Sequence, residues 1–182
     1  MNETLRTIKN RYSCRNYTGV PVEQEKLEAI ALAGIQAPSA MNNQPWKIIV
    51  IKDKAFIDEM DVATMNMLSK NTKENGVYER IMSRGGKVFY NAPCMIIVAK
   101  VPQTNMDCGI VAENIVLAAS SLGLGNVICG LAALSFKTEK GDSFKKKIIP
   151  EGYEFGVAVL IGYAENSVGK PHEVDLSKIK YI

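Results

Sequence analysis

The sequence contains a single histidine, His172, and four widely separated cysteines that form no CxxC pair. Zinc sites usually combine close cysteine pairs with histidines, so this composition excludes an ordinary zinc centre. A cysteine nucleophile would have to use His172, close to the end of the chain, as its base. We therefore predict no metal site and four reduced, buried cysteines: Cys14, Cys94, Cys108 and Cys129.

Charge of one sign and long apolar runs are also scarce. Lys and Arg number 22 against 19 Asp and Glu, and the resulting net charge of +3 is too small to indicate a nucleic-acid partner. No apolar run approaches the roughly 20 residues that span a bilayer. The amino-terminal MNETLRTIKNRY lacks the apolar stretch of a signal peptide. We expect a soluble cytoplasmic protein with neither a nucleic-acid nor a membrane partner.

What is present is an ordinary globular composition, 47% hydrophobic and 23% charged over 182 residues. This length predicts one domain covering residues 1–182. Hydrophobic periodicity predicts helices over 3–10, 22–38, 54–69, 76–88, 107–122 and 141–147, and strands over 47–51, 94–99 and 155–163, with another considered at 178–182. Buried strands separated by helices are typical of a sheet covered on both faces. Four carboxylates, Asp53, Asp58, Glu59 and Asp61, are expected to form a solvated helix face.

Two features predict a homodimer. The helix expected at 107–122 is apolar around more than one face, which indicates burial against a second subunit as well as against its own sheet. The segment 171–182 is mostly polar with an apolar end, as expected of an arm that lies on a partner subunit.

Arg11, Ser13 and Arg15 form the first candidate site. In an extended chain alternate side chains share a face, so these three would point together, with Tyr12 between them. Two guanidinium groups flanking a hydroxyl are suited to bidentate phosphate binding. A solvated basic turn is the alternative, and spacing alone leaves both interpretations open.

The second candidate is the loop 36–46, QAPSAMNNQPW. Its two prolines restrict the backbone, and its serine, asparagine and glutamine side chains offer donors and acceptors at close intervals. Small residues would let a flat ring approach the backbone, although an ordinary helix-to-strand connection fits the pattern equally well. Trp46 is expected to pack in the core. Farther along, the chain at Cys129 and Gly130 is expected to emerge beside the sheet, where its backbone N–H groups could face a ligand. Gly123-Leu124-Gly125 is not a dinucleotide fingerprint, because the third glycine is absent and the segment follows a helix.

Taken together, these segments resemble the nitroreductase family of FMN-dependent oxidoreductases. The matching pieces are R-Y-S-C-R-N-Y at 11–17, A-P-S-A-M-N-N-Q-P-W at 37–46, N-A-P at 91–93, D-C-G-I-V-A-E-N-I-V-L-A-A-S-S-L-G-L-G at 107–125 and G-K-P at 169–171. The resemblance implies an α+β fold in which helices flank a central, mostly antiparallel sheet, in a dimer. It also implies bound FMN, NADH or NADPH as electron donor, and a nitroaromatic, quinone or flavin as small-molecule acceptor. Because the flavin carries the chemistry, no catalytic side chain is implied.

The resemblance also assigns cofactor-binding residues. Arg11, Ser13 and Arg15, with Tyr12 in the same segment, match the positions that hold the FMN phosphate and ribityl oxygens. Lys170 matches a phosphate-binding position, but Gly169 stands where the family commonly has arginine.

Other positions are assigned to the flavin ring. The backbone at Cys129 and Gly130 matches the approach to flavin N5, and residues 85–87 (Gly-Gly-Lys) are proposed for the pyrimidine edge. The following match a loop that reaches the flavin of the other subunit, or lie beside it: Pro38, Ser39, Ala40, Asn42 and Gln44.

Two alternatives remain at this point. The first is a flavin-binding sink or sensor without efficient reductase turnover. The second is a thiol-dependent hydrolase that uses Cys129 or Cys14, which the absence of a suitable histidine disfavours.

Overall fold

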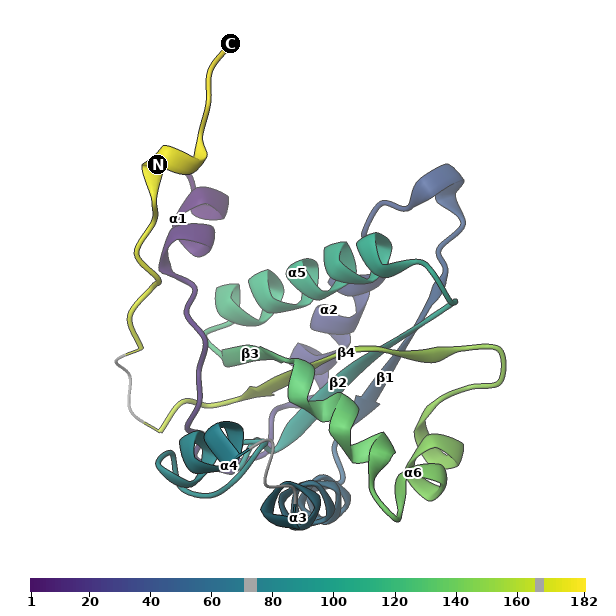
Figure 1. Cartoon of the computed structure of the whole chain (residues 1–182). Helices are drawn as coiled ribbons and strands as arrows, with labels where there is room; N and C mark the ends of the chain where they lie inside the picture. The colour runs from purple at the N-terminus through teal and green to yellow at the C-terminus, as the bar shows by residue number, and fades with distance from the viewer. Residues whose placement is uncertain (71–74, 166–168) are drawn as a thin grey trace.

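A computed structural model describes residues 1–70, 75–165 and 169–182 of the chain. Its elements in chain order (Figure 1) are α1 (Glu3–Asn10), α2 (Gln24–Ile35), η1 (Ala40–Asn42), β1 (Trp46–Ile51), α3 (Lys54–Lys70), α4 (Asn75–Met82), β2 (Cys94–Lys100), α5 (Asn105–Ser121), β3 (Gly125–Cys129), η3 (Gly130–Lys137), α6 (Gly141–Ile148), β4 (Glu154–Gly162) and η4 (Leu176–Lys178).

The strands form one sheet in the order β1-β2-β4-β3, and every neighbouring pair is antiparallel. The register of β2 against β4 shifts between Val98 and Ala99. Helices α2 and α5 lie on one side of the sheet, and α3, α4 and α6 lie on the other (Figure 1). The predicted sheet with two covered faces is therefore confirmed.

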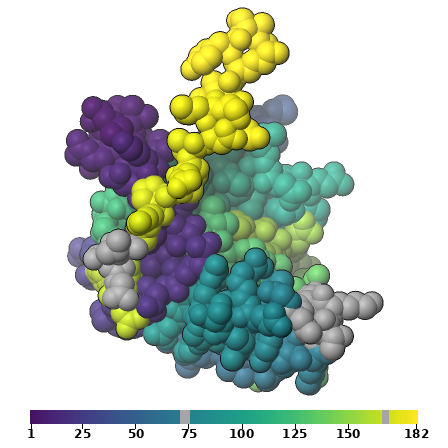
Figure 2. All heavy atoms as spheres, turned by 60° about the vertical axis from the view of Figure 1, so that its left-hand side comes forward, coloured from purple at the N-terminus to yellow at the C-terminus, as the bar shows by residue number. Residues whose placement is uncertain are grey.

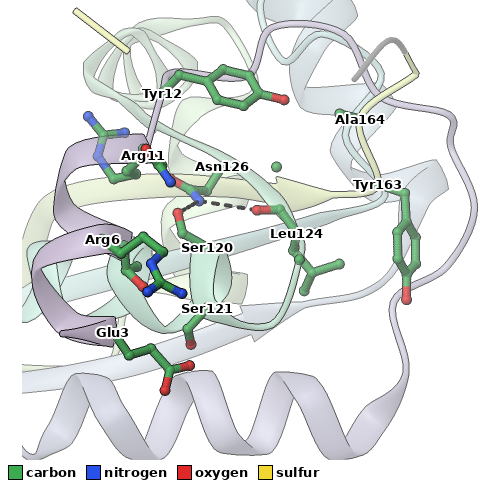
Figure 3. A pocket seen from close by; sticks show the side chains of 14 residues that line it. Glu3, Arg6, Arg11, Tyr12, Ser120, Ser121, Leu124, Asn126, Tyr163 and Ala164 are labelled. Atoms are coloured by element: carbon green, nitrogen blue, oxygen red, sulfur yellow. Dashed lines mark hydrogen bonds between the residues drawn. The ribbon is translucent and has the colours of Figure 1, made fainter. Parts of the chain in front are cut away.

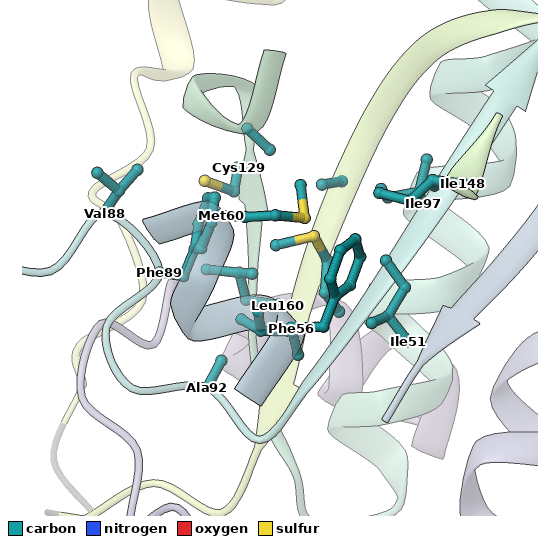
Figure 4. Close-up of a cluster of buried hydrophobic side chains, with 14 of the residues drawn as sticks. Ile51, Phe56, Met60, Val88, Phe89, Ala92, Ile97, Cys129, Ile148 and Leu160 are labelled. Carbon is teal, nitrogen blue, oxygen red and sulfur yellow. The ribbon is translucent and has the colours of Figure 1, made fainter. Parts of the chain in front are cut away.

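Strand β2 illustrates why the sheet is buried on both sides. Every one of its residues is buried, and successive side chains point to opposite faces. Ile96 and Val98 pack into the apolar cluster under α2 and α5, whereas Met95 and Ile97 pack into the cluster that includes residues of α3 and α6. Figure 4 shows part of the second cluster, where Ile97 of the sheet lies near Phe56 of α3. Trp46 is buried, as the sequence predicts.

The segment 11–17 is extended, as predicted, and runs along the outer edge of β3. The Cys14 amide donates a hydrogen bond to the Asn126 carbonyl at 2.9 Å, and the Thr18 amide donates to the Tyr163 carbonyl at 2.9 Å. The buried Tyr17 hydroxyl is 3.2 Å from the Cys14 carbonyl and 3.1 Å from the Leu160 carbonyl, to which it can donate. This candidate segment is therefore attached to the sheet.

Two sequence predictions about α3, α4 and the turn after α4 are wrong. The helix expected over 76–88 ends at Met82, because Gly85 and Gly86 follow in the left-handed region with φ of 96° and 72°. Asp61 is not on a solvated face: it is 5% exposed, and its carboxylate accepts hydrogen bonds from the Val88 and Phe89 amides at 3.3 and 2.7 Å. Those two amides need an acceptor because the helix has already ended.

Helix α1 and the chain after 169 bury little of their apolar surface in the single chain. Leu5 and Ile8 of α1 are exposed, and so are Leu176 and Ile179 of the tail. The tail stands away from the body beyond α1 (Figures 1 and 2). The strand considered at 178–182 is wrong, since η4 (Leu176–Lys178) precedes residues without regular structure that have no sheet edge beside them.

Candidate functional site

A cavity of about 590 Å³ opens on the segment that follows α1. We call it the Arg15 cavity, and its lining residues are Tyr12, Ser13, Cys14, Arg15, Asn16, Arg84, Gly85 and Gly169. This volume is in the range typical of sites for small molecules and cofactors. The segment 11–17 and the turn after α4 therefore meet at one cavity, although they are far apart in sequence.

The charge of the Arg15 cavity comes from two guanidinium groups. Arg15 donates a hydrogen bond to the Ser13 carbonyl at 3.3 Å, which holds its side chain near the backbone of its own segment. Arg84 comes from the turn after α4, and the described lining contains no carboxylate. Such a donor set favours an anionic or oxygen-rich ligand. Sequence reasoning missed Arg84, since nothing in its local pattern distinguishes it from other surface arginines.

Arg11 does not line this cavity. It lies in a second cavity of about 490 Å³, with Glu3 and Arg6 of α1, Ser120 of α5 and Asn126 of β3 (Figure 3). In the single chain the expected trio is therefore divided: Ser13 and Arg15 share one cavity, and Arg11 faces the other. Tyr12 lines both.

Tyr12 and Gly169 are packed directly against each other. A Cβ atom at position 169 would overlap the Tyr12 ring, so an arginine could not occupy this position without displacing that ring. Burial raises the pKa of the Tyr12 hydroxyl, and a hydrogen bond with the Gly169 backbone partly offsets this. Lys170 is exposed and is not among the residues that line the Arg15 cavity.

The end of β3 brings Cys129 and Gly130 to the side of the sheet where the Val88 and Phe89 amides bind Asp61. Cys129 is buried in the cluster that contains Val88 and Phe89 (Figure 4), whereas Gly130 is exposed with open space where a side chain would begin. Gly130 therefore leaves its backbone open to a flat ligand.

The loop expected to contact a ligand lies far from the Arg15 cavity in the single chain. Met41, Asn42 and Gln44 all have positive φ, of 51°, 55° and 46°. Two contacts hold this strained loop: the Gln44 amide donates to Ser39 Oγ at 2.9 Å, and the Ala40 amide donates to Asp107 Oδ1 at 3.3 Å. Pro38 immediately precedes Ser39 and is exposed.

The contact with Asp107 places the loop at the first turn of α5, whereas the segment 11–17 lies beside β3, past the other end of that helix. The 17 residues of α5 span about 25 Å at 1.5 Å per residue. Figure 1 shows the two segments on opposite sides of the molecule.

Comparison with known proteins identifies the family. The family model described as the nitroreductase family matches residues 8–162. The chain belongs to the nitroreductase family. The matched range contains the quoted motifs between residues 11 and 125, whereas G-K-P at 169–171 lies beyond it. The four-stranded antiparallel sheet between helices, shared with solved nitroreductases, confirms the expected α+β fold.

Solved structures of nitroreductases are closely similar to this chain. A nitroreductase with bound FMN from Desulfitobacterium hafniense DCB-2 is 44% identical, with a TM-score of 0.95 over 100% of this chain and 99% of that chain. A nitroreductase with bound FMN from Bacteroides fragilis NCTC 9343 is 28% identical, with a TM-score of 0.88 over the whole of both chains. Among curated relatives, the FMN reductase (NAD(P)H) of Bacillus subtilis strain 168 is 28% identical over 143 residues, which are 71% of this chain and 55% of that protein.

Two classes of feature are absent from the part of the family fold that the structure describes. Within residues 1–70, 75–165 and 169–182, no group of three or more His, Cys, Asp or Glu side chains is placed to hold a metal ion. None of the described helices combines the length and apolar character needed to cross a membrane.

The four cysteines are buried and unpaired, as predicted. Burial raises the pKa of the Cys129 thiol to about 11 and that of Cys94 to about 12, and it also raises the pKa of Cys14. The thiolate is the reactive form of cysteine, so at neutral pH these thiols are protonated and weakly nucleophilic.

We therefore expect iodoacetamide at about pH 7.5 to leave all four thiols of the native protein unmodified while it alkylates all four in denaturant. Intact-mass spectrometry of both samples provides the measurement. Rapid modification of Cys129 alone, with loss of activity, would contradict this and favour the hydrolase alternative.

Proposed function

We propose that this protein is an FMN-dependent oxidoreductase that takes hydride from NADH or NADPH and passes the electrons to a small-molecule acceptor. A nitroaromatic, a quinone or another flavin is the proposed class of acceptor. The single observation that carries the proposal is the Arg15 cavity. It is lined by the R-Y-S-C-R-N-Y segment of a nitroreductase-family chain and by two guanidinium groups, and its described lining has no carboxylate. FMN binding by the two similar nitroreductases supports the choice of cofactor.

The residues of the Arg15 cavity fit this cofactor. The Ser13 hydroxyl and the Arg15 guanidinium offer donors to phosphate and ribityl oxygens, and the Tyr12 ring forms a wall that Gly169 supports. We assign Lys170, beside Gly169, to the phosphate as well. When bound, FMN supplies the hydride chemistry; the protein binds it, orients its ring and shapes the space for donor and acceptor.

The exposed end of β3 is assigned to the reacting edge of the flavin ring. Gly130 leaves its backbone open, and Cys129 anchors that backbone in the core without offering a reactive thiolate. A hydrogen bond from a backbone N–H here would orient flavin N5 toward the donor. Because no acid–base side chain is required, no catalytic residue is assigned.

We propose that the complete site contains two subunits. The loop bearing Pro38, Ser39, Ala40, Asn42 and Gln44 cannot reach the Arg15 cavity of its own chain, because α5 separates the two. A second copy can bring its loop to this cavity, and the exposed apolar side chains of α1 and of the arm 171–182 provide surface for such an association. A homodimer then has two equivalent sites.

We expect the purified protein to be yellow and to contain FMN rather than FAD, bound non-covalently. The reason is that the sequence has one segment proposed to bind phosphate, residues 11–15, and no second fingerprint for an adenosine group. Heat release followed by chromatography identifies the flavin. Recovery of FAD, or of a flavin that remains attached to the denatured chain, would overturn this assignment.

A flavin sink or sensor is the remaining alternative, and turnover separates it from a reductase. Anaerobic addition of NADH or NADPH should bleach the bound flavin rapidly, and addition of a quinone should restore its absorbance. A flavin that stays oxidised with both donors would favour the sink or sensor.

A further inference from the structure

The turn after α4 connects the Arg15 cavity to the buried interior. Arg84 and Gly85 line the cavity, and Val88 and Phe89, a few residues later, are fully buried. Figure 4 shows Phe89 close to Met60 of α3, with Cys129 nearby, and Val88 belongs to the same buried cluster. One short segment therefore carries a cationic side chain at the cavity and is fixed at its other end inside the core.

The attachment of this turn depends on Asp61. Its two carboxylate oxygens accept separate hydrogen bonds, Oδ2 from the Phe89 amide at 2.7 Å and Oδ1 from the Val88 amide at 3.3 Å. Burial raises the pKa of Asp61, and these two amides, together with the charge of Lys87, offset that effect in part. Burying a carboxylate costs free energy, and here the two backbone hydrogen bonds offset that cost. The same two bonds fix the position of the turn.

We infer, on the basis of the proposed function, that Arg84 binds the pyrimidine edge of the flavin ring and that Asp61 is the positioning residue that holds it there. Gly85, beside Arg84, has no side chain and a φ of 96°, so a flat ring can approach the turn closely. Val88 and Phe89, at the end of the turn, pack in the same cluster as Cys129, whose backbone is assigned to the ring.

The chemistry of the ring gives Arg84 a specific effect. The pyrimidine edge of a flavin gains negative charge when the ring is reduced, so a guanidinium beside it binds the reduced form more strongly than the oxidised form. Loss of that charge should therefore lower the reduction potential of the bound flavin as well as its affinity. A side chain with only a structural role would not change the potential in this way.

The first experiment compares Arg84→Ala with Arg80→Ala, an exposed arginine one turn earlier on α4 that does not line the cavity. Fluorescence titration of the apoprotein with FMN and with riboflavin, which lacks the phosphate, gives affinities. We expect Arg84→Ala to weaken both ligands by a similar factor, about tenfold or more, and to lower the potential, while Arg80→Ala matches wild type. Arg84→Lys should recover part of both effects, since it restores charge without the planar fork.

The second experiment tests Asp61 with a double-mutant cycle. Asp61→Asn keeps the side-chain shape but can accept only one of the two amide hydrogen bonds well, so it should shift the potential in the same direction as Arg84→Ala. Because Asp61 acts through Arg84, the double variant should show little further shift beyond Arg84→Ala. Thr64→Val controls for destabilisation of α3, the helix that also carries Asp61. It removes a buried hydroxyl that is hydrogen-bonded to Ser135, and it should leave the potential unchanged.

Each outcome has one interpretation. Wild-type protein that binds no FMN contradicts the proposed function itself. If wild type binds FMN and Arg84→Ala behaves like Arg80→Ala, the assignment of Arg84 is wrong. Weaker FMN binding with unchanged riboflavin binding places Arg84 on the phosphate and overturns its assignment to the ring. Additive shifts of the reduction potential in the double variant, or an equal shift in Thr64→Val, would show that Asp61 does not position Arg84. If Asp61→Asn does not fold, the Arg84 comparisons still decide the assignment of Arg84.

Discussion

A chain that ends at Pro171 is expected to lose both its dimer and its bound FMN, although Lys170 is retained. The deleted residues include Leu176, Ile179 and Tyr181, which are exposed in the single chain and which we assign to the surface of a partner subunit. Burial of apolar surface stabilises association by about 25 cal/mol per Å² before the cost of association is subtracted. If the flavin site contains both subunits, cofactor loss and dissociation are thermodynamically coupled.

Equilibrium sedimentation monitored through the flavin absorbance measures both quantities in one sample. We expect the truncated chain to sediment as a monomer without flavin at micromolar concentration, and the full chain to sediment as a yellow dimer. A full-length variant with Lys178→Ala and Lys180→Ala serves as control, because it changes the charge of the arm and keeps its apolar side chains. A truncated monomer with full flavin content would falsify the two-subunit site.

The second large effect is expected for Arg15→Ala, which should weaken FMN binding about ten- to a hundredfold. Loss of one hydrogen bond to a charged group removes roughly 1.5–3 kcal/mol of binding free energy. Arg15 is exposed and lines its cavity, so its removal should leave the apoprotein folded. Titration of the apoprotein with FMN gives the affinity, and circular dichroism provides the control for folding.

Arg11→Ala is the informative comparison, and we expect a loss of similar size. Arg11 lies in the second cavity of the single chain, so an equal loss would mean that its side chain turns to the cofactor in the assembled protein. Unchanged flavin occupancy in both variants would mean that residues 11–15 are only a basic turn. An effect for Arg15 alone would assign Arg11 to the second cavity.

Much of the fold could be predicted from the sequence because the signals are local. The continuous apolar run at 94–99 identifies a strand buried on both faces, and the structure confirms it in β2. The order of the family motifs identifies the fold class and the segment 11–17 without knowledge of any contact. The buried state of the four cysteines follows in the same way from residue type and spacing.

The composition of the candidate site could be predicted only in part, because side chains reach it from segments that are distant in sequence. Asp61 reads as one more carboxylate on a solvated helix, and only its contact with residues 88 and 89 shows that it is buried. Arg84 falls within a predicted helix until the left-handed Gly85 and Gly86 end α4 early and turn the chain to the cavity. The sequence by itself predicted three of the four strands of the sheet, the motif order and the resemblance to the family, but it did not predict β3 (Gly125–Cys129). The tertiary structure alone decided that Arg84 lines the same cavity as Arg15 and that Arg11 lines the other cavity. Periodicity in a sequence shows which face of an element is buried, but only packing determines which elements meet.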